Sequence, residues 1–168
     1  MVPQLLSGSG TLPGIDWRPV MDNPVQILVA SSDIESRRAL TTILKDEGYE
    51  TLSASRLGDV KEALDSQNVG IVFCDRRLSD GNYRDVLGIT RAQQRPVKVV
   101  VTSRLADWDE YLEALHHGAF DLIASPCRPT DVLWALIQAR REDHERAGFV
   151  SPASETRARA ASASHITV

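Results

Sequence analysis

Short apolar runs alternate with amphipathic stretches through the middle of the chain. The runs predicted to be strands cover residues 25–30, 49–54, 69–74, 96–102 and 119–124. The stretches with apolar residues at helical spacing cover 33–48, 57–66, 83–93, 107–118 and 128–146. Asp33 is a candidate N-cap, and Gly48 and Gly118 are helix stop signals. The pattern therefore predicts a strand followed by a helix five times over.

The predicted strands lack a polar face. The run "VGIVFC" (69–74) is apolar throughout, which is typical of a strand covered by helices on both sides. Right-handed crossovers then wind the helices onto both faces of a parallel sheet. We therefore predict an α/β fold of the flavodoxin-like (βα)5 type. It is a doubly wound five-stranded parallel sheet of order 2-1-3-4-5, with two helices on one face and three on the other.

Composition divides the chain into three parts. Residues 1–24 are rich in Gly, Pro and Ser without a period, and residues 147–168 are a low-complexity mixture of Ala, Ser and Arg. Neither composition supplies enough apolar surface for a core. We therefore expect a disordered arm at 1–24, a folded domain at 25–146 and a disordered tail at 147–168.

Charge and cysteine content narrow the class of protein. The net charge of −4 does not favour nucleic acid or an anionic membrane as a partner. No apolar run approaches the roughly 20 residues of a membrane-spanning helix, and the first residues do not have the pattern of a secretory signal. Cys74 and Cys127 lie in or near apolar segments, which favours free buried thiols over a disulfide. We expect a cytoplasmic protein.

Polar side chains follow three of the predicted strands. The run "IVFCDRRLSDG" ends its apolar part on Asp75, and Ser31, Ser32 and Thr102 stand at the ends of the first and fourth runs. Sites in open parallel sheets lie at the carboxyl ends of the strands, and strands one, three and four are neighbours in the predicted order. These four side chains are therefore predicted to meet in one shallow pocket. A purely structural alternative is a carboxylate held by loop amides and Thr102.

Four fragments in this order carry a family resemblance: "ILVASSD", "IVFCDRRLSDG", "VVVTS" and "GAFDLIASP". Over residues 25–142 the chain resembles the receiver domain of bacterial two-component response regulators. The resemblance implies that Asp75 stands at the position of the aspartate that accepts a phosphoryl group from a histidine kinase. It implies that Thr102 is the hydroxyl that bonds a phosphoryl oxygen. It also implies a cis peptide bond between Ser125 and Pro126.

The site departs from the family pattern at three positions. Ser31 and Ser32 stand where the family has acids that hold Mg²⁺, and Ser125 stands where it has a lysine. Mg²⁺ sites need carboxylates, and here only Asp75 remains, with Asp33 as an outer helper. We therefore expect no metal and no cofactor. Phosphoryl transfer, which depends on positive charge around the phosphoryl oxygens, should be slowed by several powers of ten.

Two signalling functions remain open. In the first, the chain is a single-domain receiver-like module that acts by protein–protein interaction. In the second, it is a working phosphorelay receiver phosphorylated on Asp75 by a histidine kinase. The second requires one of several arginines to supply the missing charge: Arg76, Arg77, Arg104 or Arg128.

The alternative outside signalling is that the chain is a small α/β enzyme or a nucleotide-binding protein. The segment "ASSDIES" after the first strand has no glycine, so it lacks the phosphate-binding loop of dinucleotide-binding proteins. No His stands near a strand end to serve as a base, so we predict that the chain is not an enzyme.

Two further features bear on partners and metals. His116, His117 and Cys127 suggest a metal site, but adjacent helical side chains diverge by about 100°, which favours a surface pair at a helix end.

The helix at 128–146 carries apolar residues on more than one face. With Leu122 and the Trp108–Tyr111 helix it forms the expected surface for a protein partner, a histidine kinase or other signalling protein, or for a homodimer. No helix-turn-helix pattern follows, so no DNA-binding domain is expected.

Overall fold

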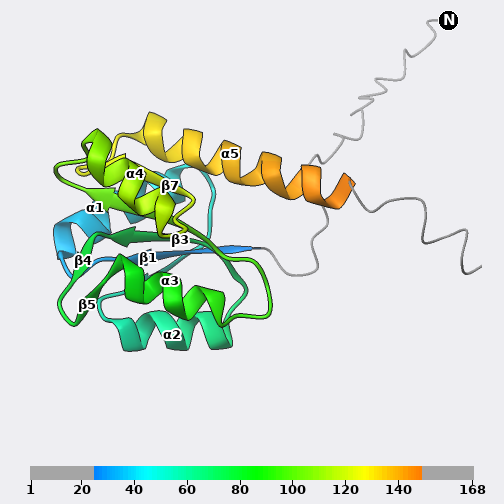
Figure 1. Cartoon of the computed structure of the whole chain (residues 1–168), viewed down its shortest axis with the longest axis horizontal. Helices are drawn as coiled ribbons and strands as arrows, with labels where there is room; N and C mark the ends of the chain where they lie inside the picture. The colour runs from blue at the N-terminus through cyan, green and yellow to red at the C-terminus, as the bar shows by residue number, and fades with distance from the viewer. Residues whose placement is uncertain (1–24, 149–168) are drawn as a thin grey trace, which may run out of the picture.

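The computed structural model describes residues 25–148, shown as the coloured ribbon in Figure 1. The predicted arm at 1–24 lies outside the described residues. So does the predicted tail, apart from residues 147 and 148, which end the last helix.

A five-stranded parallel sheet forms the centre of the domain. Its strands are β1 (Gln26–Ala30), β2 (Thr51–Ala54), β3 (Val69–Asp75), β6 (Lys98–Ser103) and β7 (Asp121–Ala124). Their order is β2-β1-β3-β6-β7, and each neighbouring pair is parallel. Counted along the chain within this sheet, that is the predicted order 2-1-3-4-5. An antiparallel hairpin of β4 (Arg77–Leu78) and β5 (Gly81–Asn82) after β3 was not predicted.

Within residues 25–148, five helices cover the sheet on both faces. They are α1 (Ile34–Asp46), α2 (Leu57–Ser66), α3 (Tyr83–Arg91), α4 (Trp108–His116) and α5 (Pro129–Gly148). Buried side chains of α1 and α5 share one apolar cluster, and those of α2, α3 and α4 share the other. The predicted division into two and three helices is therefore confirmed.

The two clusters explain why the strands have no polar face. Along β1, Ile27 and Val29 pack under α1 and α5, whereas Leu28 and Ala30 pack under the other helices. Successive strand residues point to opposite faces, so a strand between two helical layers buries every side chain.

Local signals set the ends of the helices that flank the site. Asp33 is the N-cap of α1, as predicted, and accepts hydrogen bonds from the backbone N–H groups of Glu35 and Ser36. Gly48 and Gly118 follow α1 and α4 with φ of 81° and 97°. Only glycine adopts this left-handed backbone without strain, which is why both helices stop there.

Two smaller expectations, on the cysteines and on the peptide bond before Pro126, are also met. Cys74 and Cys127 are free thiols, the first buried and the second partly buried. The Ser125–Pro126 peptide bond is cis. Within residues 25–148, no helix is both long and apolar enough to cross a membrane.

Candidate functional site

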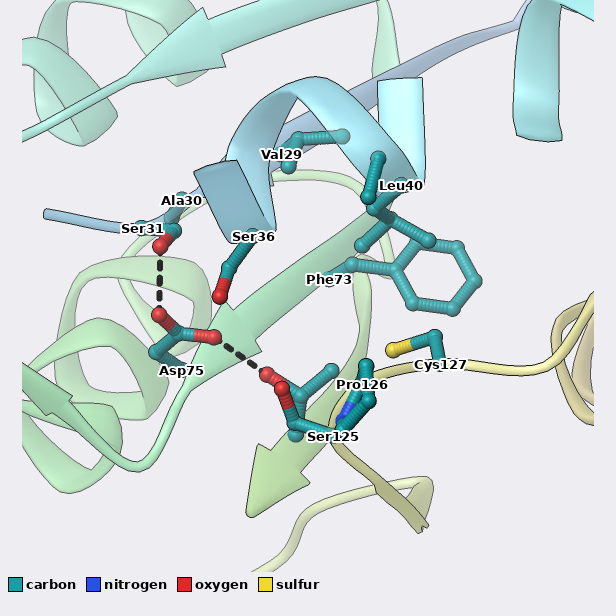
Figure 2. Close-up of a pocket in the computed structure, with 12 residues that line it drawn as sticks. Val29, Ala30, Ser31, Ser36, Leu40, Phe73, Asp75, Ser125, Pro126 and Cys127 are labelled. Atoms are coloured by element: carbon teal, nitrogen blue, oxygen red, sulfur yellow. Dashed lines mark hydrogen bonds between the residues drawn. The ribbon is translucent and has the colours of Figure 1, made fainter. Parts of the chain in front are cut away.

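The sheet register brings Asp75 next to two hydroxyl side chains. Asp75 at the end of β3 pairs with Thr102 of β6, and Cys74 pairs with Ala30, so Ser31 follows directly on the other side. Thr102 donates a hydrogen bond to one oxygen of the Asp75 carboxylate, and Ser31 donates to the other. Both hydroxyl residues are buried, whereas Asp75 is half-buried. Figure 2 shows the Ser31 hydroxyl directed at the Asp75 carboxylate. Three of the four predicted site residues therefore meet.

The fourth predicted residue, Ser32, does not join them. Its exposed hydroxyl donates to the carbonyl oxygen of Ser55 at 2.9 Å and accepts from the backbone N–H of Ser79 at 2.7 Å. Ser32 thus ties the loop after β1 to the loop after β2 and to the turn between β4 and β5. These two hydrogen bonds hold the Ser32 side chain away from Asp75.

A small cavity of about 20 Å³ lies beside Asp75. It is large enough for about one water molecule. The segment Ser125–Cys127 lines it on one side, and Ser36 and Phe73 line it on another (Figure 2). Burial, with the nearby Asp75 charge, raises the pKa of the Cys127 thiol to about 12. The Cys127 thiol therefore lines the cavity in its protonated form, which is a poor nucleophile.

The arginines near the site are engaged elsewhere or exposed. Arg104 pairs with Asp33 at 3.2 Å. The backbone N–H groups of Ser36 and Glu35, and then Arg104, hold the pKa of Asp33 below its ordinary value. Arg76 pairs with Glu110 and Glu113, away from Asp75. The two remaining candidates, Arg77 and Arg128, are exposed. Among the described residues, no ion pair places a cation on Asp75.

Comparison with known proteins decides the family. The family model for the response regulator receiver domain matches residues 27–137. The chain belongs to this family. Receiver domains are signalling modules of two-component systems, generally without enzymatic activity, and they interact with histidine kinases and other signalling proteins.

Curated relatives of this receiver domain are longer regulators. The chain is 31% identical over 117 residues to the alginate biosynthesis transcriptional regulatory protein AlgB of Pseudomonas putida, covering 70% of this chain and 26% of that protein. It is 31% identical over 131 residues to the DNA-binding response regulator MtrA of Mycobacterium tuberculosis, covering 75% of this chain and 55% of that protein. The chain thus spans about a quarter of the first and about half of the second.

Solved structures show the same fold. A CheY-like receiver domain protein from Methanospirillum hungatei superposes with a TM-score of 0.64 at 21% identity, covering 73% of this chain and 98% of that one. The receiver domain of NtrX from Brucella abortus gives 0.61 at 26% identity, covering 68% and 97%.

The donor set of this receiver domain does not fit a magnesium ion. Asp75 accepts from two hydroxyls, and Asp33 uses one oxygen to cap α1 and the other to pair with Arg104. Mg²⁺ gives up its water reluctantly and needs carboxylate ligands in near-octahedral geometry. In residues 25–148 no group of three or more His, Cys, Asp or Glu side chains is placed to hold a metal. His116 and His117 lie at the end of α4, with ring centroids 5.8 Å apart.

We expect calorimetric titration with Mg²⁺ in the millimolar range to give no saturable heat. Asp75→Asn, which removes the one carboxylate at the centre of the site, is the matched variant and should give the same flat trace. Saturable binding by the natural chain that disappears in Asp75→Asn would show that the site does hold the ion.

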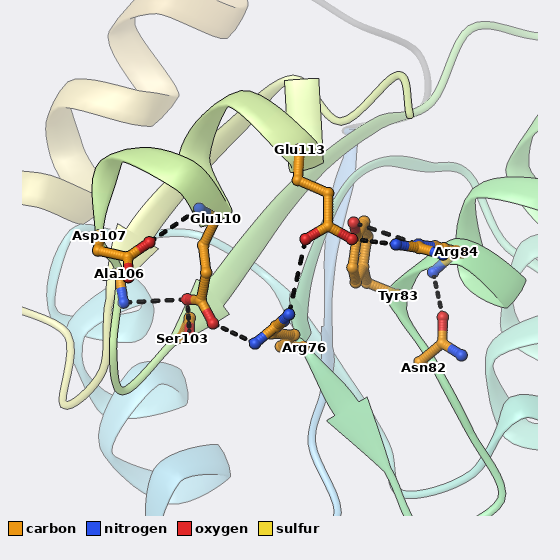
Figure 3. A network of polar contacts seen from close by, with 9 residues as sticks. All are labelled: Arg76, Asn82, Tyr83, Arg84, Ser103, Ala106, Asp107, Glu110 and Glu113. Atoms are coloured by element: carbon orange, nitrogen blue, oxygen red, sulfur yellow. Dashed lines mark hydrogen bonds and ion pairs between the residues drawn. The ribbon is translucent and has the colours of Figure 1, made fainter. Parts of the chain in front are cut away.

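Sequence reasoning missed a polar network centred on Glu110, which Figure 3 shows. Glu110 on α4 is only 7% exposed, and it accepts hydrogen bonds from Ser103, from the backbone N–H of Ala106 and from Arg76. Arg76 and Ser103 directly follow Asp75 and Thr102 in the chain. The network therefore joins the two strand ends of the site to α4.

One sequence signal for Glu110 was available. It lies four residues before Ala114, which is buried, so both occupy the same face of α4. A buried acidic residue needs hydrogen-bond donors or a cation, and Ser103, Ala106 and Arg76 provide them.

Proposed function

We propose that this chain is a receiver-like signalling module that acts by protein–protein interaction, without regular phosphorylation of Asp75. One observation carries the proposal. The two oxygens of the Asp75 carboxylate accept hydrogen bonds from the neutral hydroxyls of Ser31 and Thr102. No Lys, Arg or His side chain within residues 25–148 forms an ion pair with this carboxylate.

Phosphoryl transfer to a carboxylate needs positive charge where the phosphoryl oxygens will lie. By the family resemblance, Ser31 and Ser32 replace the magnesium-binding acids and Ser125 replaces the lysine. Each electrostatic donor of this kind is worth roughly 3–4 kcal/mol, so losing two slows transfer by about four to six powers of ten. The serine hydroxyl that remains stabilises the unmodified carboxylate instead.

An exposed apolar patch on α4 and the loop before it is the surface proposed for the partner. Leu105, Trp108 and Leu112 are 68%, 69% and 47% exposed, and Trp108 stacks on Tyr111 with ring centroids 5.4 Å apart. We call these three residues the α4 patch. Leu122 was expected in this surface, but it is buried, because its side chain packs under α2, α3 and α4. Exposed aromatic and aliphatic clusters are typical of protein–protein contacts.

The Glu110 network holds this patch in one position. Glu110 bonds the loop before α4 through Ala106, whose φ of 44° is unusual for a residue other than glycine. Glu113, one turn further on, pairs with Arg76 and Arg84. A surface fixed before binding loses less entropy on association, which suits a module that works without a phosphorylation switch.

Affinity capture with the full chain as bait tests this function. Asp75→Asn should capture the same signalling partner as the natural chain, with or without Mg²⁺ and acetyl phosphate. Trp108→Ala should lose it, whereas Ile34→Ala, which trims an exposed apolar side chain on α1, should not.

The opposite pattern supports the working phosphorelay receiver. In that case capture depends on Mg²⁺ and a phosphodonor and is lost in Asp75→Asn.

A further inference from the structure

The hairpin of β4 and β5 presents an arginine and a serine on the same outward side. Arg77 and Ser79 are exposed, whereas Leu78 between them is buried in the apolar cluster under α2, α3 and α4. Side chains two residues apart along an extended segment point to the same side, so Arg77 and Ser79 face the solvent together. The hairpin therefore displays a hydroxyl with a cation two residues before it.

Neither of these side chains holds the hairpin in place. The backbone N–H of Ser79 donates to the Ser32 hydroxyl at 2.7 Å, and the Asp80 carboxylate accepts from the backbone N–H of Leu57 at 3.1 Å. Within residues 25–148, the Ser79 hydroxyl and the Arg77 guanidinium form no hydrogen bond or ion pair. Both groups are therefore available to an enzyme that acts on this chain.

We propose that Ser79 is a phosphorylation site for a serine/threonine protein kinase that selects an arginine shortly before its target. Kinases choose their substrates largely by such charge patterns. In the transfer, the Ser79 hydroxyl oxygen bonds to the γ-phosphorus of ATP, the bond from that phosphorus to ADP breaks, and the hydroxyl proton passes to the catalytic aspartate of the kinase. Arg76, three residues before Ser79, pairs with two carboxylates of α4. Arg77 is therefore the arginine that the kinase contacts.

Local structure distinguishes Ser79 from other hydroxyls that follow an arginine. Thr41 and Thr130 have an arginine three and two residues before them, but Thr41 lies within α1 and Thr130 in the first turn of α5. Helical backbone hydrogen bonds keep both threonines from entering an enzyme cleft as an extended segment. Ser79 lies at the tip of a hairpin whose strands have two residues each, and exposed loop tips are where enzymes reach a folded chain.

Phosphorylation of Ser79 changes the charge next to the Asp75 site. A phosphoserine carries a charge of about −1.5 to −2, and Arg77 on the same side is placed to pair with it. Because Ser79 bonds Ser32, this charge lies beside the loop after β1. The same loop carries Ser31, which donates to Asp75. The modification does not depend on the proposed function, since ATP supplies the phosphoryl group and Asp75 takes no part in the transfer.

Phosphorylation of the full chain in solution tests the site. Ser162 also follows an arginine by three residues in the sequence, so every sample carries Ser162→Ala. The probe is the catalytic domain of an arginine-selective serine/threonine kinase with Mg²⁺ and ATP, chosen because it modifies a synthetic peptide of residues 74–82. We expect the intact mass of the folded chain to rise by one phosphoryl group and peptide mapping to place that group on Ser79.

Four variants separate this modification from other causes of the mass gain. Ser79→Ala should abolish the gain, and Arg77→Ala should slow it about tenfold or more. Arg104→Ala, which removes another exposed arginine, should leave the rate unchanged. Asp75→Asn should gain the group as the natural residue does, which distinguishes the reaction from transfer to Asp75. A folded chain that stays unmodified at Ser79 overturns the proposal. So does an unchanged rate in Arg77→Ala, and so does a peptide that no arginine-selective kinase accepts.

Discussion

A triple variant, Ser31→Asp with Ser32→Asp and Ser125→Lys, should gain one phosphoryl group from acetyl phosphate in the presence of Mg²⁺. The natural chain should gain little or none under the same conditions. The difference in rate should be about four to six powers of ten, because the variant restores both the metal-binding carboxylates and the lysine charge. Intact mass followed over time measures the gain.

The expected gain rests on features that the natural chain retains. Asp75 and Thr102 are already adjacent, and Ser125 lines the cavity beside Asp75, so a lysine there starts next to the acceptor. Replacing Ser31 also removes the hydroxyl that occupies one oxygen of Asp75. The acids must be introduced together with the lysine, because carboxylates clustered without a cation repel one another.

Two controls test whether the gain comes from the added charge and whether Asp75 is the acceptor. Alanine at the same three positions removes the hydrogen bond from Ser31 to Asp75 without adding charge, so this variant should remain unmodified. Asp75→Asn in the triple background should abolish the gain. Circular dichroism must show that the triple variant is folded, because Ser32 bonds the loop after β2 and the turn between β4 and β5. A folded triple variant that binds Mg²⁺ and still stays unmodified would mean that charge is not what the natural site lacks.

Removing the buried carboxylate of α4 should produce a large loss of stability. Glu110→Ala is expected to lower the free energy of unfolding by about 2–4 kcal/mol. The change leaves Ser103 and the Ala106 N–H without their acceptor, and it removes one of the two ion-pair partners of Arg76. The value lies below that of a fully buried ion pair, because Arg76 is 40% exposed and water can reach it.

Urea unfolding measures this loss against a matched variant. Glu113→Ala removes a carboxylate of the same helix that also pairs with Arg76 and Arg84. Because this carboxylate is more exposed than that of Glu110, its loss should lower the free energy of unfolding clearly less than Glu110→Ala does. Equal losses in the two variants would mean that the buried position of Glu110 has no special weight.

The fold was predictable because its signals are local and repeated. Five alternations of an apolar run and an amphipathic stretch left few topologies, and Asp33, Gly48 and Gly118 marked helix ends that the structure confirms. The meeting of Asp75 with Ser31 and Thr102 followed from strand order, since the ends of neighbouring parallel strands lie side by side.

The features that sequence reasoning missed depend on contacts between distant segments. The orientation of Ser32 is decided by hydrogen bonds to Ser55 and Ser79 in two other loops. The buried state of Glu110 depends on Arg76, which is 34 residues away in sequence. No spacing within one helix or one loop specifies such pairs.

The most direct measurement of the central claim is the intact mass of the natural full chain after incubation with acetyl phosphate and Mg²⁺. If Asp75 is held by its two hydroxyl partners and no cation assists it, the mass should remain that of the unmodified protein. Rapid gain of one phosphoryl group that is abolished in Asp75→Asn would contradict the proposal and identify the chain as a working phosphorelay receiver.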